Sequence, residues 1–195
     1  MSVNSLETPA GYVACVMAEE KIAVDDPRTP DVRALLERHL NFARGQTPPE
    51  HSFALGIEGL LDPEITLFSV RADGSLLGIG AIKRLSPDHA EIKSMHTAEA
   101  ARGRGVGRAM LAHLLEVART RGYRRVSLET GTTAAFAPAR ALYQGVGFVP
   151  CGPFAGYQPS EDNTFLTLEL GTTQAADCGS RSGFKFRCHR PITDR

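Results

Sequence analysis

Three glycines alternate with arginine and valine in the segment ARGRGVGRAM, residues 101–110, directly before an apolar, helix-like run. The first N–H groups of a helix have no intrahelical partner, and the helix dipole places partial positive charge at that end. Glycines let a ligand approach the backbone without meeting Cβ atoms, and Arg102, Arg104 and Arg108 add positive charge. The pattern favours binding of a phosphate or pyrophosphate group.

Two common phosphate-binding patterns do not fit this segment. The dinucleotide pattern GxGxxG fails because Arg108 stands where a third glycine should follow Gly103 and Gly105, and the P-loop pattern fails because no Gly-Lys-Ser/Thr follows. The pattern that fits is Arg102-x-x-Gly105-x-Gly107, between a predicted strand and a long amphipathic helix. By itself, the segment is also compatible with a tight turn on an exposed basic surface.

The elements before the glycine segment begin with a predicted strand at 21–26. Asp31 is expected to cap a helix over 32–43, and a loop and a short helix at 53–61 follow. Asp73-Gly74 then predicts a hairpin between two strands. The three strands predicted in this region lie at 65–71, 75–85 and 90–97.

The elements after the glycine segment are a predicted helix that starts at Val106 and stops at Gly122, a strand, and a short helix that Pro138 opens. Two final strands complete the order. The three strands predicted here lie at 124–130, 146–152 and 163–170. The order predicts one mixed α/β domain over about residues 19–170, with an N-terminal extension at 1–18 and a flexible tail at 171–195.

Composition excludes several classes of protein. The 195 residues are 42% hydrophobic and 23% charged, as in an ordinary globular protein, and the zero net charge argues against a dedicated nucleic-acid binder. No apolar run approaches 18 residues and no signal peptide is evident, so we expect a cytoplasmic protein without a membrane span. The cysteines fit no CxxC ribbon. Cys178, Cys188 and His189 could bind a metal or form a disulfide in the tail, but reduced thiols and no metal are the favoured expectation.

The pattern from Arg102 to Gly107 resembles the R/Q-x-x-G-x-G/A signature of the GNAT superfamily of acyl-CoA-dependent N-acyltransferases. Its context agrees, because a carboxylate lies in the preceding strand and the later segment ARALYQGVGF supplies Tyr143 and Phe148 in the family's register. The resemblance covers about residues 20–170. It implies the GNAT fold: a central mixed, mostly antiparallel sheet that splays between its fourth and fifth strands, with helices on both faces.

The resemblance implies acetyl-CoA as the acyl donor, with the coenzyme pyrophosphate on the glycine segment. A backbone N–H in the stretch 95–97 would stabilise the developing charge on the thioester oxygen. The same stretch would pair with the pantetheine arm as an added strand does. The residues implied to bind coenzyme are Met95, His96, Thr97, Arg102, Gly103, Arg104, Gly105, Val106, Gly107 and Arg108.

Tyr143 matches the family's general acid, which would protonate the departing thiolate. One departure from the family lies nearby: the asparagine often found seven residues before this tyrosine is Phe136 here. Thr132, Thr133 or backbone groups could replace the contact that the asparagine makes.

Three residues are candidates for the general base, in the order Glu91, Glu129 and His96. Period-two alternation predicts that Glu91 and every second residue after it, from Lys93 to Thr97, share one face of the strand, with His96 on the other face. Lys93 would then pair with Glu91 and lower the pKa of its carboxyl, which would make Glu91 a poorer base.

The function implied is direct transfer of an acetyl group to a primary amine of a small molecule or peptide. The alternative is a non-catalytic acyl-CoA sensor with the same cradle. We expect the acceptor pocket to draw on residues 41–61 and 151–163, where the polar side chains are His51, Glu58, Tyr157 and Glu161. Family members often dimerise, so a homodimer is a further expectation.

Overall fold

The computed structural model describes residues 20–48, 51 and 53–171. Its elements, in chain order, are β1 (Lys21–Val24), α1 (Pro30–Gln46), α2 (Ile57–Leu60), β2 (Ile65–Ala72), β3 (Ser75–Ser86), β4 (His89–Thr97), η2 (Glu99–Ala101), α3 (Val106–Thr120), β5 (Arg125–Gly131), η3 (Ala134–Phe136), α4 (Ala137–Val146), β6 (Val149–Cys151) and β7 (Asn163–Glu169). The strands form one sheet in the order β1-β2-β3-β4-β5-β7-β6. All neighbours are antiparallel except β4 and β5. The predicted mixed, mostly antiparallel sheet is confirmed.

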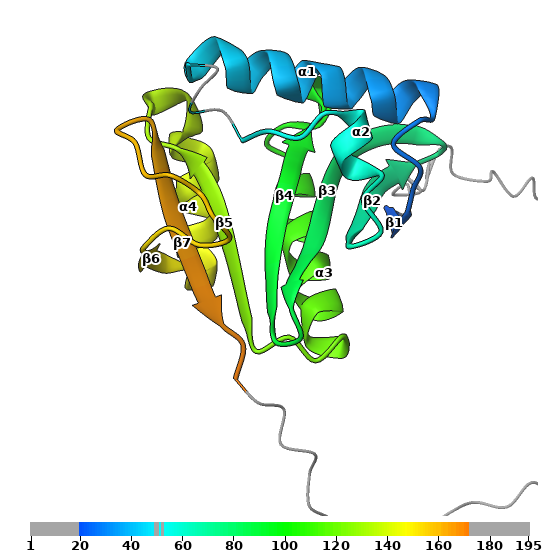
Figure 1. Ribbon diagram of the computed structural model, residues 1–195. Helices are drawn as coiled ribbons and strands as arrows, with labels where there is room; N and C mark the ends of the chain where they lie inside the picture. The colour runs from blue at the N-terminus through cyan, green and yellow to red at the C-terminus, as the bar shows by residue number, and fades with distance from the viewer. Residues whose placement is uncertain (1–19, 49–50, 52, 172–195) are drawn as a thin grey trace, which may run out of the picture.

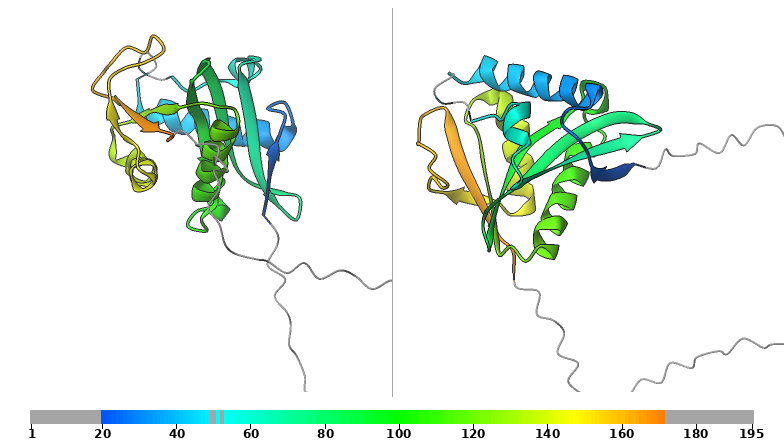
Figure 2. Two further views of the ribbon diagram at one scale, coloured as in Figure 1. Left: turned by 90° about the horizontal axis from the view of Figure 1, so that it is seen from below. Right: turned by 45° about the vertical axis from the view of Figure 1, so that its right-hand side comes forward.

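The two edges of the sheet belong to the two ends of the described chain. Figure 2 shows β1 at one edge and β6, with the loop that leads to β7, at the other. Helix α1 runs across the upper end of the sheet in Figure 1. The helices therefore pack on the strands between these two edges, on both faces of the sheet.

Helices α1 and α2 pack on one face of the sheet. Buried side chains of α1, among them Leu35 and Leu36, and Leu60 of α2 meet Leu67 of β2 and Ile79 of β3. Helix α1 begins one residue before the predicted cap, because Thr29 is the N-cap residue and Pro30 starts the helix. The helix also continues to Gln46, so the prediction of a loop directly after residue 43 was wrong.

Helices α3 and α4 pack on the opposite face. Two glycines of β3 bring α3 close to the sheet: a Cβ atom on Gly80 would lie 2.8 Å from the Met110 side chain, and one on Gly78 would lie 2.9 Å from Val106. The resulting core is the larger of the two and includes Leu111 and Leu114 of α3. Helices therefore cover both faces, as predicted.

Turn residues end most elements where the sequence predicts. Asp73 (φ 48°) and Gly74 (φ 77°) form the β2–β3 turn, and Gly122 (φ 81°) follows the end of α3. Helix α4 contains Pro138 in its first turn, as predicted, but it extends through Val146. Because that residue is helical, the strand predicted at 146–152 is limited to β6.

The parallel pair β4–β5 is short. Its register joins only His89–Glu91 to Arg125–Ser127. Beyond these residues the two strands diverge toward the end of the sheet that α1 crosses, and a V-shaped opening separates them (Figure 1). The predicted splay between the fourth and fifth strands is confirmed. It leaves the edge of β4 from Ile92 to Thr97 without a strand partner on the β5 side.

Within the described ranges, no helix combines the length and the apolar character needed to cross a membrane. The predicted extension at 1–18 and the predicted tail, apart from Gly171, lie outside the described residues. The same holds for the candidate metal or disulfide residues Cys178, Cys188 and His189.

Candidate active site

The glycine segment forms a turn that opens α3. Gly103 (φ 74°) and Gly105 (φ 89°) adopt left-handed backbone conformations, and a Cβ atom on either would meet no atom within 4 Å. Gly105 is the N-cap residue of α3 and provides no side-chain cap. The first intrahelical bond runs from the Ala109 N–H to the Gly105 carbonyl at 2.9 Å. The N–H groups of 106–108 precede that bond, so the turn offers open backbone donors at the positive end of a helix dipole.

A β-bulge interrupts β4 beside this turn. Ile79 of β3 pairs with His96, and Ala81 pairs with Lys93, so the single residue between them on β3 faces both Ser94 and Met95. Ser94 has a left-handed backbone (φ 53°), which is uncommon for a residue other than glycine. An extra residue in one strand reverses the alternation of side chains beyond it.

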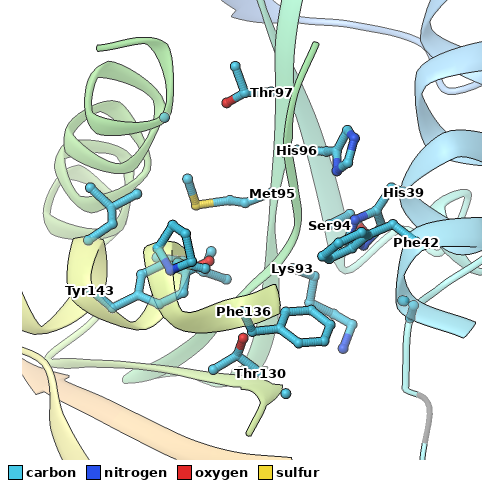
Figure 3. Close-up of a pocket in the computed structure, with 18 of the residues that line it drawn as sticks. His39, Phe42, Lys93, Ser94, Met95, His96, Thr97, Thr130, Phe136 and Tyr143 are labelled. Carbon is cyan, nitrogen blue, oxygen red and sulfur yellow. The ribbon is translucent and has the colours of Figure 1, made fainter. Parts of the chain in front are cut away.

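The bulge corrects the predicted facing of β4. Because cross-strand partners share a face, His96 lies on the α1 side of the sheet together with Glu91 and Lys93. Met95 and Thr97 lie on the α3 side, contrary to the alternation expected from the sequence. Figure 3 shows His96 directed toward α1 and Met95 directed the opposite way, toward Tyr143.

A cavity of about 940 Å³ passes between the diverging strands. Its α3 side is lined by the glycine turn, Met95, Thr97 and Tyr143, and its α1 side by side chains of α1, the loop that follows it, β4 and β5 (Figure 3). We call these two linings the α3 side and the α1 side below. The volume lies within the usual range for small-molecule and cofactor sites. Lining residues of the α1 side include His39, Phe42, Phe53, Lys93, His96, Glu129 and Phe136.

The two candidate carboxylates differ in their surroundings. Glu91 is 2% exposed, and its Oε1 accepts hydrogen bonds from Lys93 Nζ at 3.0 Å and from the Tyr157 hydroxyl. It is not among the residues that line the cavity. Glu129 does line the cavity, and burial, together with the nearby Glu91 charge, raises the pKa of Glu129 to about 7 against the opposing effect of Lys93.

The phenol of Tyr143 also reaches the cavity. Tyr143 comes from α4, is 7% exposed and packs edge-to-face on Phe148, with ring centroids 5.9 Å apart. Burial, and secondarily the charge of Glu129, raise the pKa of the Tyr143 phenol above its ordinary value. The hydroxyl therefore stays protonated and can act as a donor at neutral pH.

Two imidazoles stand together on the α1 side. The rings of His39 and His96 meet edge-to-face with centroids 5.4 Å apart. Burial, aided by nearby positive charges, lowers the pKa of each imidazole to about 4, so both are neutral at pH 7. His39 Nδ1 and the Ser94 hydroxyl are buried and have no hydrogen-bond partner among the described residues.

The structure brings most of the predicted site residues to one cavity. All of the predicted coenzyme-binding residues line it except Arg104, which is exposed. Thr132 and Thr133 do not line it, and the Thr132 hydroxyl donates to the Glu161 carbonyl at 2.7 Å. Phe136, in the place of the family's asparagine, does line it.

The expected acceptor segments contribute unequally. Residues of 41–61 line the cavity, whereas no residue of 151–163 does so directly. Tyr157 does not line the cavity, but its hydroxyl is hydrogen-bonded to Lys93, which does, and to Glu91. The sequence did not point to His39 and Ser94 as residues that line the cavity. His39 carries no sequence signal that distinguishes it from other polar residues of a helix, and Ser94 is distinguished only by the bulge, which the sequence does not predict.

Comparison with known proteins supports the resemblance to the GNAT superfamily. The sequence profile described as "Acetyltransferase (GNAT) family" matches residues 29–148. The uncharacterized N-acetyltransferase YsnE of Bacillus subtilis (strain 168) is 44% identical over 149 residues, which cover 76% of this chain and 99% of that protein. An IAA acetyltransferase of Azospirillum brasilense is 31% identical over 155 residues, covering 79% of this chain and 100% of the relative.

Solved structures show the same fold. A Bacillus subtilis acetyltransferase in complex with CoA superimposes with a TM-score of 0.60 at 18% identity, over 78% of this chain and 99% of that one. A GNAT acetyltransferase from Elizabethkingia anophelis with acetyl-CoA bound gives a TM-score of 0.55 at 17% identity, over 77% and 98% of the two chains. From the fold, the cavity and the extent of the sequence match, we conclude that the chain is an acyltransferase that belongs to the GNAT family of acetyltransferases.

Proposed function

We propose that this protein transfers an acetyl group from acetyl-CoA to a primary amine by direct attack of the amine, with both substrates held in the one cavity. The observation that carries the proposal is the cavity itself. It joins open helix N–H groups on the α3 side to an ionisable carboxyl, Glu129, on the α1 side. CoA and acetyl-CoA in two structural neighbours agree with this donor.

The α3 side fits the coenzyme. The open N–H groups after Gly105 suit a pyrophosphate, and Arg102 and Arg108 add positive charge beside them. A side chain at Gly103 or Gly105 would occupy the space that the phosphate oxygens need, and the left-handed backbone disfavours one. The unpaired edge of β4 from Ile92 to Thr97 suits the amide groups of a pantetheine arm.

Acetyl-CoA supplies a thioester carbonyl carbon for the amine to attack. The amine must first lose a proton, and Glu129 is the group that we assign to accept it. A carboxyl with a pKa near 7 is ionised in part at neutral pH and still basic enough to take a proton. Glu91, ranked first from the sequence, is engaged by Lys93 and Tyr157, and we assign it to holding that lysine instead.

Two further groups complete the reaction. Backbone N–H groups in the stretch 95–97, at the bulge and beside the unpaired strand edge, would donate to the thioester oxygen as negative charge develops there. The protonated Tyr143 hydroxyl would donate its proton to the departing sulfur and regain one from the attacking nitrogen, which loses its second proton as the amide forms. The proton that Glu129 takes from the amine is released to solvent after the product leaves.

Calorimetric titration with CoA, followed by a thiol-release assay with acetyl-CoA and a panel of amines, tests the proposal. We expect saturable CoA binding that Gly105→Glu abolishes, and thiol release that depends on an amine. Absence of CoA binding at millimolar concentration would contradict the proposed donor. CoA binding without amine-dependent thiol release would contradict the proposed transfer.

A further inference from the structure

Three phenylalanines from separate segments line the α1 side of the cavity. Phe42 belongs to α1, Phe53 to the loop after it, and Phe136 to η3, and all line the cavity. The rings of Phe42 and Phe136 are edge-to-face with centroids 5.0 Å apart, and Phe53 packs edge-to-face on Tyr157 at 4.7 Å. The α1 side therefore carries two pairs of packed rings, and we call Phe42, Phe53 and Phe136 the aromatic wall of the cavity.

The ring of Phe136 is fixed by the glycine at the end of β5. A Cβ atom on Gly131 would lie 2.3 Å from the Phe136 ring, so the ring packs directly on the strand backbone. Gly131 and Glu129 point to the same face of β5, because they are two residues apart in the strand. The flat ring and the carboxyl thus line one side of the same opening.

The charges that act on Glu129 come from Lys93 and Glu91. Glu129 is the one carboxyl among the described residues that line the cavity. Lys93, which is 9% exposed, donates to Glu91 and to the Tyr157 hydroxyl. His39 and His96 are neutral at pH 7. With Glu129 ionised, the group of Glu91, Lys93 and Glu129 has a net negative charge.

This net negative charge and the apolar rings beside it discriminate between classes of acceptor amine. The ammonium group of an acceptor is attracted to Glu129, but an α-carboxylate one carbon away would lie close to the same negative charge and be repelled. A second ammonium group at the far end of the acceptor would meet phenyl rings in place of a carboxylate, and a cation–π attraction offsets only part of the cost of burying that charge. A flat apolar group would instead pack against the rings.

We propose that the acceptor is an arylalkylamine, a primary amine on a short chain that ends in a flat apolar ring. The amine lies at Glu129, and the ring packs against Phe42, Phe53 and Phe136. This inference rests on the proposed acetyl transfer and specifies its acceptor. The arrangement makes these phenylalanines specificity-determining residues, separate from the groups that move protons.

Four amines isolate each element of the proposal: 2-phenylethylamine, butylamine without the ring, L-phenylalanine with an added α-carboxylate, and putrescine with a second ammonium group. Each is titrated into the protein saturated with CoA, and each is then assayed with acetyl-CoA. We expect 2-phenylethylamine to bind about tenfold or more tightly than each of the others, since one aromatic contact and the apolar area it buries are together worth that factor.

Leucine variants test whether the preference for an aromatic amine depends on the phenylalanine rings. Phe42→Leu and Phe136→Leu keep apolar volume but remove the flat ring, and we expect KM for 2-phenylethylamine to rise about fivefold to tenfold with kcat and the KM for acetyl-CoA unchanged. Phe154→Leu is the matched control, because Phe154 packs on Tyr157 and Phe165 but does not line the cavity. Thermal unfolding confirms that each variant is folded.

Each outcome bears on the proposal. Equal or tighter binding of any comparison amine overturns it, and so does an equal rise in KM for butylamine in the leucine variants, which would mean that the rings act only on structure. Absence of CoA binding is different, because it refutes the proposed function on which the inference rests. CoA binding without a preference for the aromatic amine refutes the inference alone.

Discussion

The α3 side and the α1 side of the cavity are built in different ways. The α3 side consists largely of backbone: one continuous segment, 102–108, forms its turn, and a strand edge forms its wall. The α1 side consists of side chains from α1, the loop after it, β4, β5 and η3. Backbone N–H groups are the same in every sequence, whereas each side chain can be exchanged alone. The first construction suits a constant substrate and the second suits a particular one.

The largest effect is expected from loss of the general base on the α1 side, which should slow the reaction without weakening coenzyme binding on the α3 side. We expect Glu129→Gln to lower kcat about 100-fold or more, the usual value of a general base, while CoA affinity stays unchanged. Because burial raises the pKa of Glu129 to about 7, the wild-type kcat/KM should increase as the pH rises through about 7 and the carboxyl loses its proton. The pH profile of the variant should lack this rise.

Glu91→Gln is the matched control for that variant. It removes the same charge from the same face of the sheet, but at a residue that does not line the cavity. We expect the pH dependence to persist in this variant but to shift to lower pH, because the Glu91 charge contributes to the raised pKa of Glu129. A profile that flattens in Glu91→Gln and not in Glu129→Gln would contradict the assignment of the base.

Tyr143→Phe should have the next largest effect, and on the α3 side. Loss of the hydroxyl removes the proposed donor to the sulfur, so we expect kcat to fall on the order of tenfold to 100-fold. The phenyl ring keeps its contact with Phe148, and the melting temperature should change little. Rapid-quench measurement of a single turnover checks whether the chemical step is the one that slows. Unchanged single-turnover rates would remove Tyr143 from the mechanism.

A smaller effect tests the backbone construction directly. Gly105→Ala places a Cβ atom in the space proposed for the phosphate oxygens, and we expect CoA to bind about tenfold more weakly; the left-handed backbone separately costs about 1–2 kcal/mol of stability. Gly122→Ala is its control, because Gly122 (φ 81°) has the same handedness and the same open space at the other end of α3. Calorimetry should show normal CoA affinity for the control despite a similar loss of stability.

The smallest effect on activity is expected from the imidazoles of the α1 side, which act on stability instead. The pKa values of His39 and His96 are about 4 in the folded protein, below the ordinary 6.5, so the unfolded chain binds protons first as the pH falls. Their stabilising contribution is complete above pH 6.5 and is lost toward pH 4. We expect about 2 kcal/mol lost by pH 5 for His39 and less for the less deeply buried His96, measured by urea unfolding. The double variant His39→Gln, His96→Gln should show a shallower pH dependence.

The sequence predicted the α3 side far better than the α1 side. The turn at Gly103 and Gly105 depends on local backbone conformation, which the glycines and the helix pattern after them predict. The facing of His96 depends on a bulge at Ser94, where no glycine marks the irregularity, so strict alternation gave the wrong face. The preference for Glu129 over Glu91 could not be read from the chain, because both stand in strands and only the divergence of β4 from β5 exposes one of them to the cavity.

The contact between Gly131 and Phe136 has a consequence for how the two positions can vary. A Cβ atom at position 131 would collide with the ring at position 136 as it is placed here, so we expect a lineage to acquire this phenylalanine after position 131 has become glycine. The reverse path has the opposite order, with the ring lost before the glycine. Descendants that replace Phe136 with a smaller residue are thereby released to vary at position 131, and the two sites should be found to change together along the family tree.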